Sequence, residues 1–337
     1  MADSIMSEGS IPVYGGNGLR GYTDSWNHQG EYVLIGRQGA LCGNVKYVSG
    51  DTYITEHAIA VKASESNNTK FLQYLFERMD LGRYSDQSAQ PGLAVNKLLK
   101  LKARIPHLNE QIKIADFFAL LDSRITTQIG AIEATESLIT GITSKVSRSN
   151  NVKQMYLKDL LTERTERNAD HHEVYSVSVS EGVVNQVEYL GRSFAAADTS
   201  HYCVARYGDI IYTKSPTGSF PYGIVKRSDI SEPVAVSPLY GVYRPLNDNI
   251  GIYLHQYFCS AINAHNYLHK LIQKGAKNTI NITNQRFLEN TVPIPDEAIL
   301  EKYVKVIDAL MQKLKNEKCL LESYRQQKFY LLKNMFV

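Results

Sequence analysis

The sequence contains few of the residues that build disulfide-rich folds or structural metal sites. Its four cysteines form no Cys-x-x-Cys pair and lie far apart, at Cys42, Cys203, Cys259 and Cys319. This spacing gives no support to a disulfide framework or a zinc knuckle, so we expect reduced thiols. The neighbouring histidines His171 and His172 have no third ligand at a useful spacing, and we predict no metal site.

Long apolar runs and a strong charge imbalance are also missing. No apolar run approaches the roughly 18 residues that span a bilayer, and Met1-Ala2-Asp3-Ser4 lacks the basic-then-apolar order of a secretion signal. We therefore expect a cytoplasmic protein without membrane contact. The net charge of +3 is too small to identify a nucleic-acid partner by itself.

Recognisable catalytic motifs are absent from the sequence. It has no Asn-Pro-Pro-Tyr-like motif for base methylation, no phosphate-binding Gly-x-x-x-x-Gly-Lys loop and no Gly-x-Ser-x-Gly elbow. Gly16, Gly18 and Gly21 have the spacing of a dinucleotide-binding loop, but Pro12 interrupts the short stretch before them and no helical pattern follows. We interpret the segment as a glycine-rich loop that directs Arg20 outward, as a DNA contact or as a plain turn. A nucleotide-binding enzyme that uses these glycines is kept as an alternative.

The dominant feature that the sequence does contain is an internal repeat. Pro106 and Glu110 in the first copy stand opposite Pro293 and Glu297 in the second. In each copy a proline ends an extended stretch, a capping Asn or Asp follows, and a long helical pattern begins. The first copy has no counterpart to the opening residues of the second, so we expect it to be shortened at its N-terminus.

Two long segments have apolar residues at seven-residue spacing, which makes paired helices wind around each other. Within 107–149 and 294–337 we predict two helices of about 38 residues each, which pair antiparallel as a coiled coil roughly 55–60 Å long. The predicted seam consists of Phe118, Leu121, Ile125, Ile132 and Ile139 with Ile307, Leu310, Leu314, Leu321 and Tyr324. Polar residues that we expect to fix the helix register interrupt it at Gln128, Thr135, Glu317 and Lys328.

The remaining regions, 1–106 and 150–293, contain short β-prone runs separated by turn residues, which predicts two β-rich domains. The runs predicted as strands are 32–36, 44–48 and 58–61 in the first region, and 175–179, 209–213, 223–226, 233–236 and 239–243 in the second. One helix is predicted in each region, over 69–79 and over 250–273. The predicted fold class is therefore α+β, with two β-rich domains separated by two long helices.

This organisation resembles the specificity subunit of type I restriction-modification systems. The resemblance depends on the proline junction before each long helix and on four sequence stretches: Tyr14-Gly-Gly-Asn-Gly-Leu-Arg-Gly-Tyr, Ile35-Gly-Arg-Gln-Gly-Ala-Leu-Cys-Gly-Asn-Val, Thr55-Glu-His-Ala and Asn278-Thr-Ile-Asn-Ile-Thr. It implies that 1–106 and 150–293 are target recognition domains, each reading half of a bipartite site in double-stranded DNA. The helices 107–149 and 294–337 would be the spacer.

The resemblance also implies a division of labour with partner subunits. Methyltransferase (modification) subunits and restriction/translocase subunits would carry the catalysis, using S-adenosylmethionine, ATP and Mg²⁺. This chain would then be non-catalytic and hold no cofactor. The alternative from the residues alone is a coiled-coil scaffold that binds only protein.

Candidate DNA-contacting residues are those whose side chains suit phosphates or base edges. The stretch 214–223, Lys-Ser-Pro-Thr-Gly-Ser-Phe-Pro-Tyr-Gly, is the preferred reading loop because it combines a cation, hydroxyls and aromatics. The full set is Arg20, Arg37, Gln38, Lys46, Lys214, Thr217, Ser219, Tyr222, Lys226, Lys274, Lys277 and Asn278. A solvated side chain or a structural turn remains the alternative for each of them.

Overall fold

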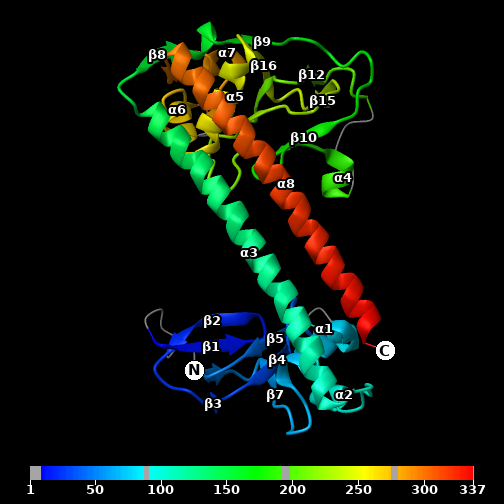
Figure 1. Cartoon of the computed structure of the whole chain (residues 1–337). Coiled ribbons are helices and arrows are strands. Elements are labelled where there is room, and N and C mark those ends of the chain that lie inside the picture. Colours follow the sequence, from blue (N-terminus) through cyan, green and yellow to red (C-terminus); the bar gives the residue numbers. More distant parts are fainter. Residues whose placement is uncertain (1–8, 87–90, 192–197, 275–279, 337) are drawn as a thin grey trace. The chain divides into compact units, whose positions relative to one another are not determined.

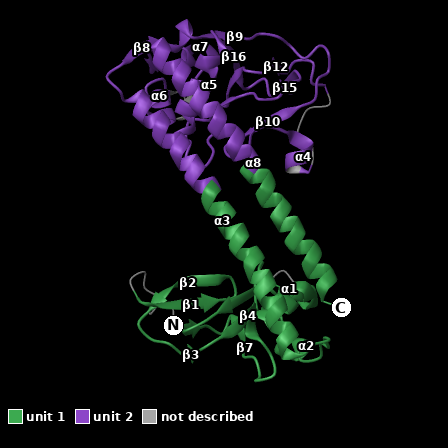
Figure 2. Ribbon diagram, viewed as in Figure 1, with its two compact units in different colours: residues 1–131, 317–337 green, residues 132–316 purple. Residues whose placement is uncertain are grey.

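A computed structural model describes residues 9–86, 91–191, 198–274 and 280–336 (Figure 1). The chain divides into two compact units, and each contains a β-rich region with the adjoining parts of both long helices (Figure 2). Unit 1 consists of residues 1–131 and 317–337, and unit 2 consists of residues 132–316. The unit boundaries therefore fall inside the helices and not at their ends. No helix of the described residues is long and apolar enough to cross a membrane.

Unit 1 is built on two small sheets. The first contains β1 (Ile11–Gly15), β2 (Gly18–Thr23), β3 (His28–Gln29) and β6 (Asp51–Ile54), in the order β2-β1-β6-β3. The second contains β4 (Tyr32–Gly36) between its antiparallel partners β5 (Val45–Val48) and β7 (Ala58–Val61). Three helical segments complete the region: α1 (Thr69–Met79), a 3₁₀ turn η2 (Leu81–Tyr84) and α2 (Val95–Leu98).

The central strand β4 links the two layers of unit 1. Successive side chains of a strand point to opposite faces, and β4 is apolar on both. Val33 packs against Phe71 and its neighbours on α1, whereas Leu34 packs against Ile54 of the first sheet. The predicted helix over 69–79 is confirmed with the same bounds. It begins there because the side chain of Asn68 accepts a hydrogen bond from the backbone N–H of Phe71 and caps the helix.

The glycine-rich segment near the N-terminus is a β-hairpin, where the sequence predicted a loop. β1 and β2 pair antiparallel, and β1 also pairs in parallel with β6 despite containing Pro12. Gly18 follows the turn with φ of +93°, a value that glycine adopts without steric cost. A strand follows these glycines, whereas a dinucleotide-binding loop leads into a helix.

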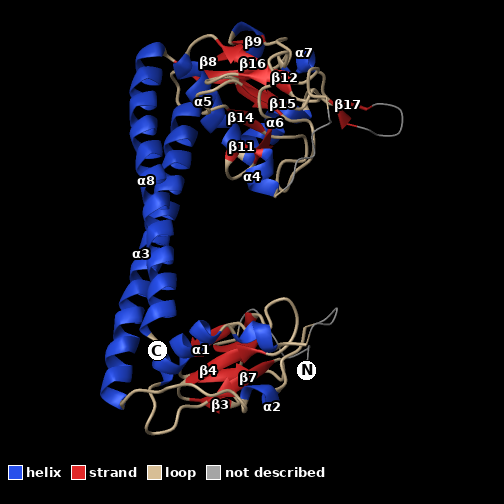
Figure 3. Ribbon diagram, turned by 90° about the vertical axis from the view of Figure 1, so that its right-hand side faces the viewer, coloured by secondary structure: helices blue, strands red, loops and turns tan. Residues whose placement is uncertain are grey.

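Unit 2 contains a four-stranded sheet in the order β14-β13-β16-β9, formed by β14 (Val225–Arg227), β13 (Ile210–Tyr212), β16 (Gly241–Pro245) and β9 (Leu161–Glu163). Four two-stranded sheets surround it: β12 (Cys203–Ala205) with β15 (Val234–Val236), β10 (Tyr175–Ser178) with β11 (Gly182–Asn185), β19 (Thr291–Pro295) with β8 (Val152–Tyr156), and β17 (Gln273–Lys274) with β18 (Ile280–Asn281). The short helices are η3 (Leu157–Asp159), α4 (Gln186–Leu190), α5 (Asp248–Cys259), α6 (Ala261–His269) and α7 (Asn284–Phe287). Figure 3 distinguishes these helices from the strands.

The helix predicted over 250–273 is wrong as a single element, because the structure has α5 and α6 with a break at Ser260. The backbone of Ser260 is extended, with φ of −75° and ψ of 116°. Its hydroxyl accepts a hydrogen bond from the backbone N–H of Asn263 at 3.3 Å. Serine is a favoured N-cap because its side chain satisfies a free N–H at the start of a helix. Ser260 therefore ends one helix and begins the next.

The two long helices are α3 (Leu108–Ser147) and α8 (Glu297–Met335). In unit 1 the first part of α3 lies beside the last part of α8, and the two run in opposite directions (Figure 1). In unit 2 the Tyr303 hydroxyl of α8 lies 2.8 Å from the Thr143 hydroxyl of α3. The predicted antiparallel pairing is thus confirmed within each unit. All ten predicted seam residues are buried or half-buried.

Polar residues of the seam bond to one another across the helices of unit 1. The Gln128 amide donates to the backbone carbonyl of Glu317 at 3.1 Å and also to its carboxylate. Lys328 Nζ lies 2.7 Å from Asp122 Oδ1 and 3.2 Å from Glu77 Oε2 on α1. These partners exist in only one alignment of the helices, so they favour a single register.

Replacing Lys328 by methionine should destabilise the docking of α8 in unit 1 by about 2 kcal/mol. The substitution keeps the apolar stem but leaves two partly buried carboxylates without a counter-charge. We place the loss below that of a fully buried pair because Lys328 is 19% exposed. Hydrogen exchange of the amides in 318–335 measures the effect. Lys333→Met is the control, since Lys333 is exposed on the same helix, and equal protection in the two variants would contradict the prediction.

Candidate nucleic-acid interface

Two hairpin loops occupy equivalent places in the two units. In unit 1, β4 pairs with β5 and β7 on either side, and residues 37–44 join β4 to β5. In unit 2, β13 pairs with β14 and β16 in the same antiparallel way, and residues 213–224 join β13 to β14. The two loops therefore join equivalent pairs of strands in the two units.

The loop of unit 1 has a fixed backbone and exposed polar side chains. The N–H of Arg37 donates to the carbonyl of His57 at 3.0 Å, and its own carbonyl accepts from Leu93 N–H at 2.8 Å. The side chain of Arg37 is exposed, as is that of Gln38, which hydrogen-bonds the His57 ring at 3.0 Å. Gly43 is required here because a Cβ would lie 2.1 Å from the backbone nitrogen of Gly82. Backbone hydrogen bonds thus fix the start of the loop, and the side chain of Arg37 is exposed to solvent.

Two further predicted contacts of unit 1 lie on strands. Arg20 is exposed on β2, and its stem lies so close to Gly15 that a Cβ there would meet the Arg20 Cδ at 2.7 Å. Lys46 is exposed on β5, with its Nζ 5.8 Å from the ring centroid of Tyr14. Both side chains are positioned by packing of their neighbours while their charges face solvent.

The loop of unit 2 contains a tight turn anchored by one buried aromatic ring. Thr217 and Phe220 exchange backbone hydrogen bonds of 3.0 and 2.9 Å, and Phe220 is buried. Thr217 and Ser219 are exposed at this turn. Lys214 is half-buried at the start of the loop, where burial lowers the pKa of its ammonium group. The ring of Tyr222 lies 5.2 Å from that of His265, so it is held against α6.

The four remaining predicted contacts are Lys226, Lys274, Lys277 and Asn278. Lys226 lies in the interior of unit 2, only 7% exposed, with its Nζ 3.5 Å from Cys259 Sγ. The prediction that Lys226 contacts DNA is therefore wrong. All three residues of β14 are buried, and the sequence pattern of the strand does not reveal that both of its faces are covered. Lys274 is on β17. Lys277 and Asn278 lie outside the described residues.

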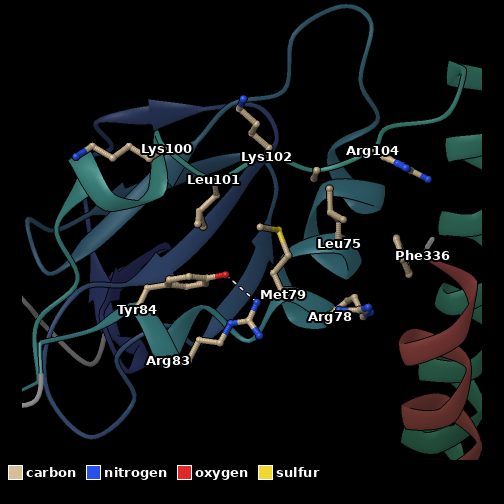
Figure 4. Close-up of a pocket in the computed structure, with 11 residues that line it drawn as sticks. Leu75, Arg78, Met79, Arg83, Tyr84, Lys100, Leu101, Lys102, Arg104 and Phe336 are labelled. Atoms are coloured by element: carbon tan, nitrogen blue, oxygen red, sulfur yellow. Dashed lines mark hydrogen bonds between the residues drawn. The ribbon is translucent and has the colours of Figure 1, made fainter.

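The sequence-based choice missed a cationic pocket in unit 1 (Figure 4). The cavity has a volume of about 500 Å³, and five of its lining residues are basic: Arg78, Arg83, Lys100, Lys102 and Arg104. Leu75, Met79 and Leu101 lie among these cations (Figure 4). The alternating cations of Lys100-Leu-Lys-Ala-Arg104 were a visible signal. The sequence does not show that these residues lie beside α1 and η2, because that proximity depends on the tertiary fold.

None of the five cations forms an ion pair within the described part of the chain, and no carboxylate lines the pocket there. Arg83 donates to the hydroxyl of its neighbour Tyr84 at 2.7 Å, which leaves its charge uncompensated. Like charges that gather without counter-charges create a local positive potential that attracts anions. The pocket, named here the cation pocket, is therefore the part of unit 1 best suited to a phosphate group.

Comparison with known proteins shows a likeness over part of the chain. Residues 2–134 match the family described as the type I restriction modification DNA specificity domain. This part of the chain is similar to type I specificity subunits. The match covers the β-rich region of unit 1 and the first part of α3, and over these residues it agrees with the resemblance inferred from the repeat.

Two curated relatives of this specificity family show sequence similarity. The chain is 48% identical over 118 residues to the type I restriction enzyme EcoprrI specificity subunit of Escherichia coli, and this covers 34% of the chain and 29% of that relative. It is 28% identical over 126 residues to a putative type I restriction enzyme specificity subunit of Haemophilus influenzae, covering 36% and 33%. The aligned part of the chain thus spans about a third of each relative.

Solved structures extend the likeness of fold to the whole chain. The S subunit of the type I restriction-modification system from M. genitalium has a TM-score of 0.65 at 15% identity, covering 100% of this chain and 91% of that one. A second structure, described as the basis of complex assembly and conformational transition of the type I restriction-modification system, has a TM-score of 0.52 at 13% identity over 90% of this chain and 81% of that one. These two structures and this chain therefore share a similar fold.

Proposed function

We propose that this chain is a DNA-recognition subunit that reads a bipartite site in double-stranded DNA for a type I restriction-modification complex. The observation that carries the proposal is the repeated plan of the two units, each of which has an exposed loop at the same edge of an antiparallel hairpin. Two similar reading loops in one chain suit a target with two parts. The family match over residues 2–134 supports the same role.

We assign affinity and sequence reading to different residues. Lysine and arginine contacts to phosphates supply affinity that does not depend on sequence, whereas side chains at base edges supply the reading. In unit 1 the cation pocket would bind phosphates, and Arg37 with Gln38 would contact bases. An arginine suits guanine and a glutamine suits adenine, since each makes two hydrogen bonds to one base. In unit 2 the exposed turn at Thr217 and Ser219 would read the second half.

The catalytic steps would belong to partner subunits. Methyltransferase subunits would use S-adenosylmethionine, and restriction/translocase subunits would use ATP and Mg²⁺, with this chain directing both to the site. The long helices α3 and α8 contribute to both units, so their length is suited to set the spacing between the half-sites. At about 1.5 Å per residue, one added heptad lengthens a helix by about 10 Å, or roughly three base pairs of DNA.

Mapping methylated adenines in cells that express the chain with its methyltransferase subunits tests the proposal. We expect a split motif, of which Arg37→Ala relaxes only one half and the double variant Thr217→Ala/Ser219→Ala only the other, because each removes contacts worth about 1–3 kcal/mol of base discrimination. Lys305→Ala is the control, since Lys305 is exposed on α8 and belongs to neither loop. A motif unchanged in both variants would overturn the loop assignment. Absence of DNA binding by the assembled complex would favour a protein-only scaffold.

A further inference from the structure

Unit 2 contains a cysteine that faces two nitrogen donors. Cys259 lies at the end of α5, and its Sγ accepts from Lys226 Nζ of β14 at 3.5 Å. His255, one turn earlier on α5, has its Nε2 3.8 Å from the same sulfur. Both distances suit hydrogen bonds to sulfur, and the sulfur of a thiolate is an acceptor. None of the residues that the proposed function uses belongs to this cluster, because the buried Lys226 is no longer among them.

The hydrogen bonding of His255 determines which of its nitrogens faces the sulfur as a donor. The backbone N–H of Arg227 donates to His255 Nδ1 at 3.0 Å, so Nδ1 is an acceptor. A neutral imidazole has one donor and one acceptor nitrogen, and its proton is therefore on Nε2. The Nε2–H then points its positive end toward Cys259 Sγ.

Burial of Lys226 strengthens the argument for a charged sulfur. Lys226 is 7% exposed, and within the described residues its one polar partner is Cys259. A buried ammonium group is costly without a nearby negative charge. Burial alone raises the pKa of Cys259, but His255 and Lys226 outweigh this and lower the pKa to about 7. Half of the thiol groups would be ionised near neutral pH.

The third titratable group that faces Cys259 is Tyr303, which comes from α8. Burial raises the pKa of Tyr303 to about 12, so it stays neutral near pH 7. The other cysteines with a resolved direction differ from Cys259. Burial raises the pKa of Cys42 and of Cys203, and neither faces a cation–imidazole pair of this kind. The Lys226–His255 arrangement therefore distinguishes one thiol of the chain.

We propose that Cys259 is a reactive thiolate that small peroxides oxidise to a sulfenic acid, a covalent modification site within the recognition unit. The thiolate sulfur attacks one peroxide oxygen, an S–O bond forms and the O–O bond breaks. The electron pair leaves on the second oxygen as hydroxide, which takes a proton from the Lys226 ammonium and becomes water. Sulfur loses two electrons and the peroxide gains them. Cys259 is half-buried, so access suits hydrogen peroxide better than a bulky disulfide.

Alkylation of the full chain by iodoacetamide at a series of pH values tests the ionisation. Peptide mass spectrometry follows Cys259 in the folded and in the denatured chain. We expect half-maximal reactivity near pH 7 in the folded chain, and near the ordinary thiol value of about 8.5 after denaturation. Coincident pH profiles in the two states would overturn the proposal. This comparison needs no variant. It therefore tests the ionisation of Cys259 even if a substitution prevents folding.

Trapping with dimedone after exposure to hydrogen peroxide tests the modification itself. We expect the adduct on Cys259, with the exposed Cys319 as an internal reference in the same sample. Lys226→Met keeps the buried stem without the charge, and it should slow adduct formation about tenfold at pH 7 because less thiolate is present. Circular dichroism verifies that the variant folds. An adduct confined to Cys319, or a rate unchanged in folded Lys226→Met, would contradict the proposal.

Discussion

Replacing Lys100, Lys102 and Arg104 together by alanine should weaken binding of the chain to duplex DNA about a hundredfold at about 0.15 M salt. The three cations line the cation pocket of unit 1 and have no ion-pair partner within the described residues. Each phosphate contact releases about 0.9 of a condensed counterion, so three lost contacts reduce the slope of log affinity against log salt by about 2.7. Titration of a labelled duplex over a series of salt concentrations measures both quantities.

A matched control separates local contacts from net charge. Lys302, Lys305 and Lys315 are three exposed lysines on α8, and their combined replacement removes the same charge outside the pocket. This control should lose little affinity, because long-range attraction is screened beyond a Debye length of about 8 Å at physiological salt. Equal losses in the two triple variants would show that the pocket does not contact phosphate. An unchanged salt slope in the pocket variant would do the same.

Replacing Asp209 by alanine should destabilise unit 2 by about 3–5 kcal/mol, the usual cost of breaking a buried ion pair from one side. Asp209 is 1% exposed, and its Oδ2 accepts from Arg164 Nε at 2.6 Å. Its Oδ1 accepts from the second nitrogen of the same guanidinium at 3.0 Å, and its Oδ2 also accepts from the N–H of Arg206 at 2.9 Å. The pair connects the end of β9 to the start of β13 across β16, so its loss affects the whole sheet.

Urea unfolding followed by hydrogen exchange in β13 and β16 measures this effect, since a chain with two units need not unfold in a single transition. Glu232→Ala is the control because Glu232 is exposed and bonds only its neighbour Ser231 among the described residues. We expect the control to change stability by less than about 0.5 kcal/mol. A similar loss of stability in the two variants would contradict the prediction. It would mean that water hydrates the Arg164 guanidinium well enough to replace the Asp209 carboxylate.

Elements with a local signal could be predicted from the sequence. The seven-residue spacing around Phe118 and Ile307 reports directly on which face of a helix is buried, so both long helices and their seam followed from it. Their polar interruptions were also informative. Gln128 and Glu317 are 189 residues apart in the sequence. Each one interrupts the apolar repeat of its own helix, and the two side chains meet across the helix pair.

Elements that depend on distant contacts could not be predicted in the same way. A helix period continues through Ser260, and only the packing of α5 and α6 reveals that its hydroxyl serves as a cap. Lys226 looks solvent-exposed in the sequence because nothing local reveals that Cys259 covers it. The cation pocket combines side chains from α1, η2, the segment after α2 and Phe336, which directly follows α8. Such groups of residues come together only in the tertiary fold, so secondary-structure propensities cannot predict them.

The polar contacts across the long helices constrain how the length of this protein can change during evolution. One contact joins Gln128 to Glu317 in unit 1, and another joins Thr143 to Tyr303 in unit 2. Residues inserted into α3 between Gln128 and Thr143 would break one of the two contacts. Both contacts survive only if the same number of residues is inserted into α8 between Tyr303 and Glu317. Paired insertions or deletions, equal in both helices, are thus the changes that such a chain tolerates. Natural variants with a different spacing between half-sites should carry them in both repeats at once.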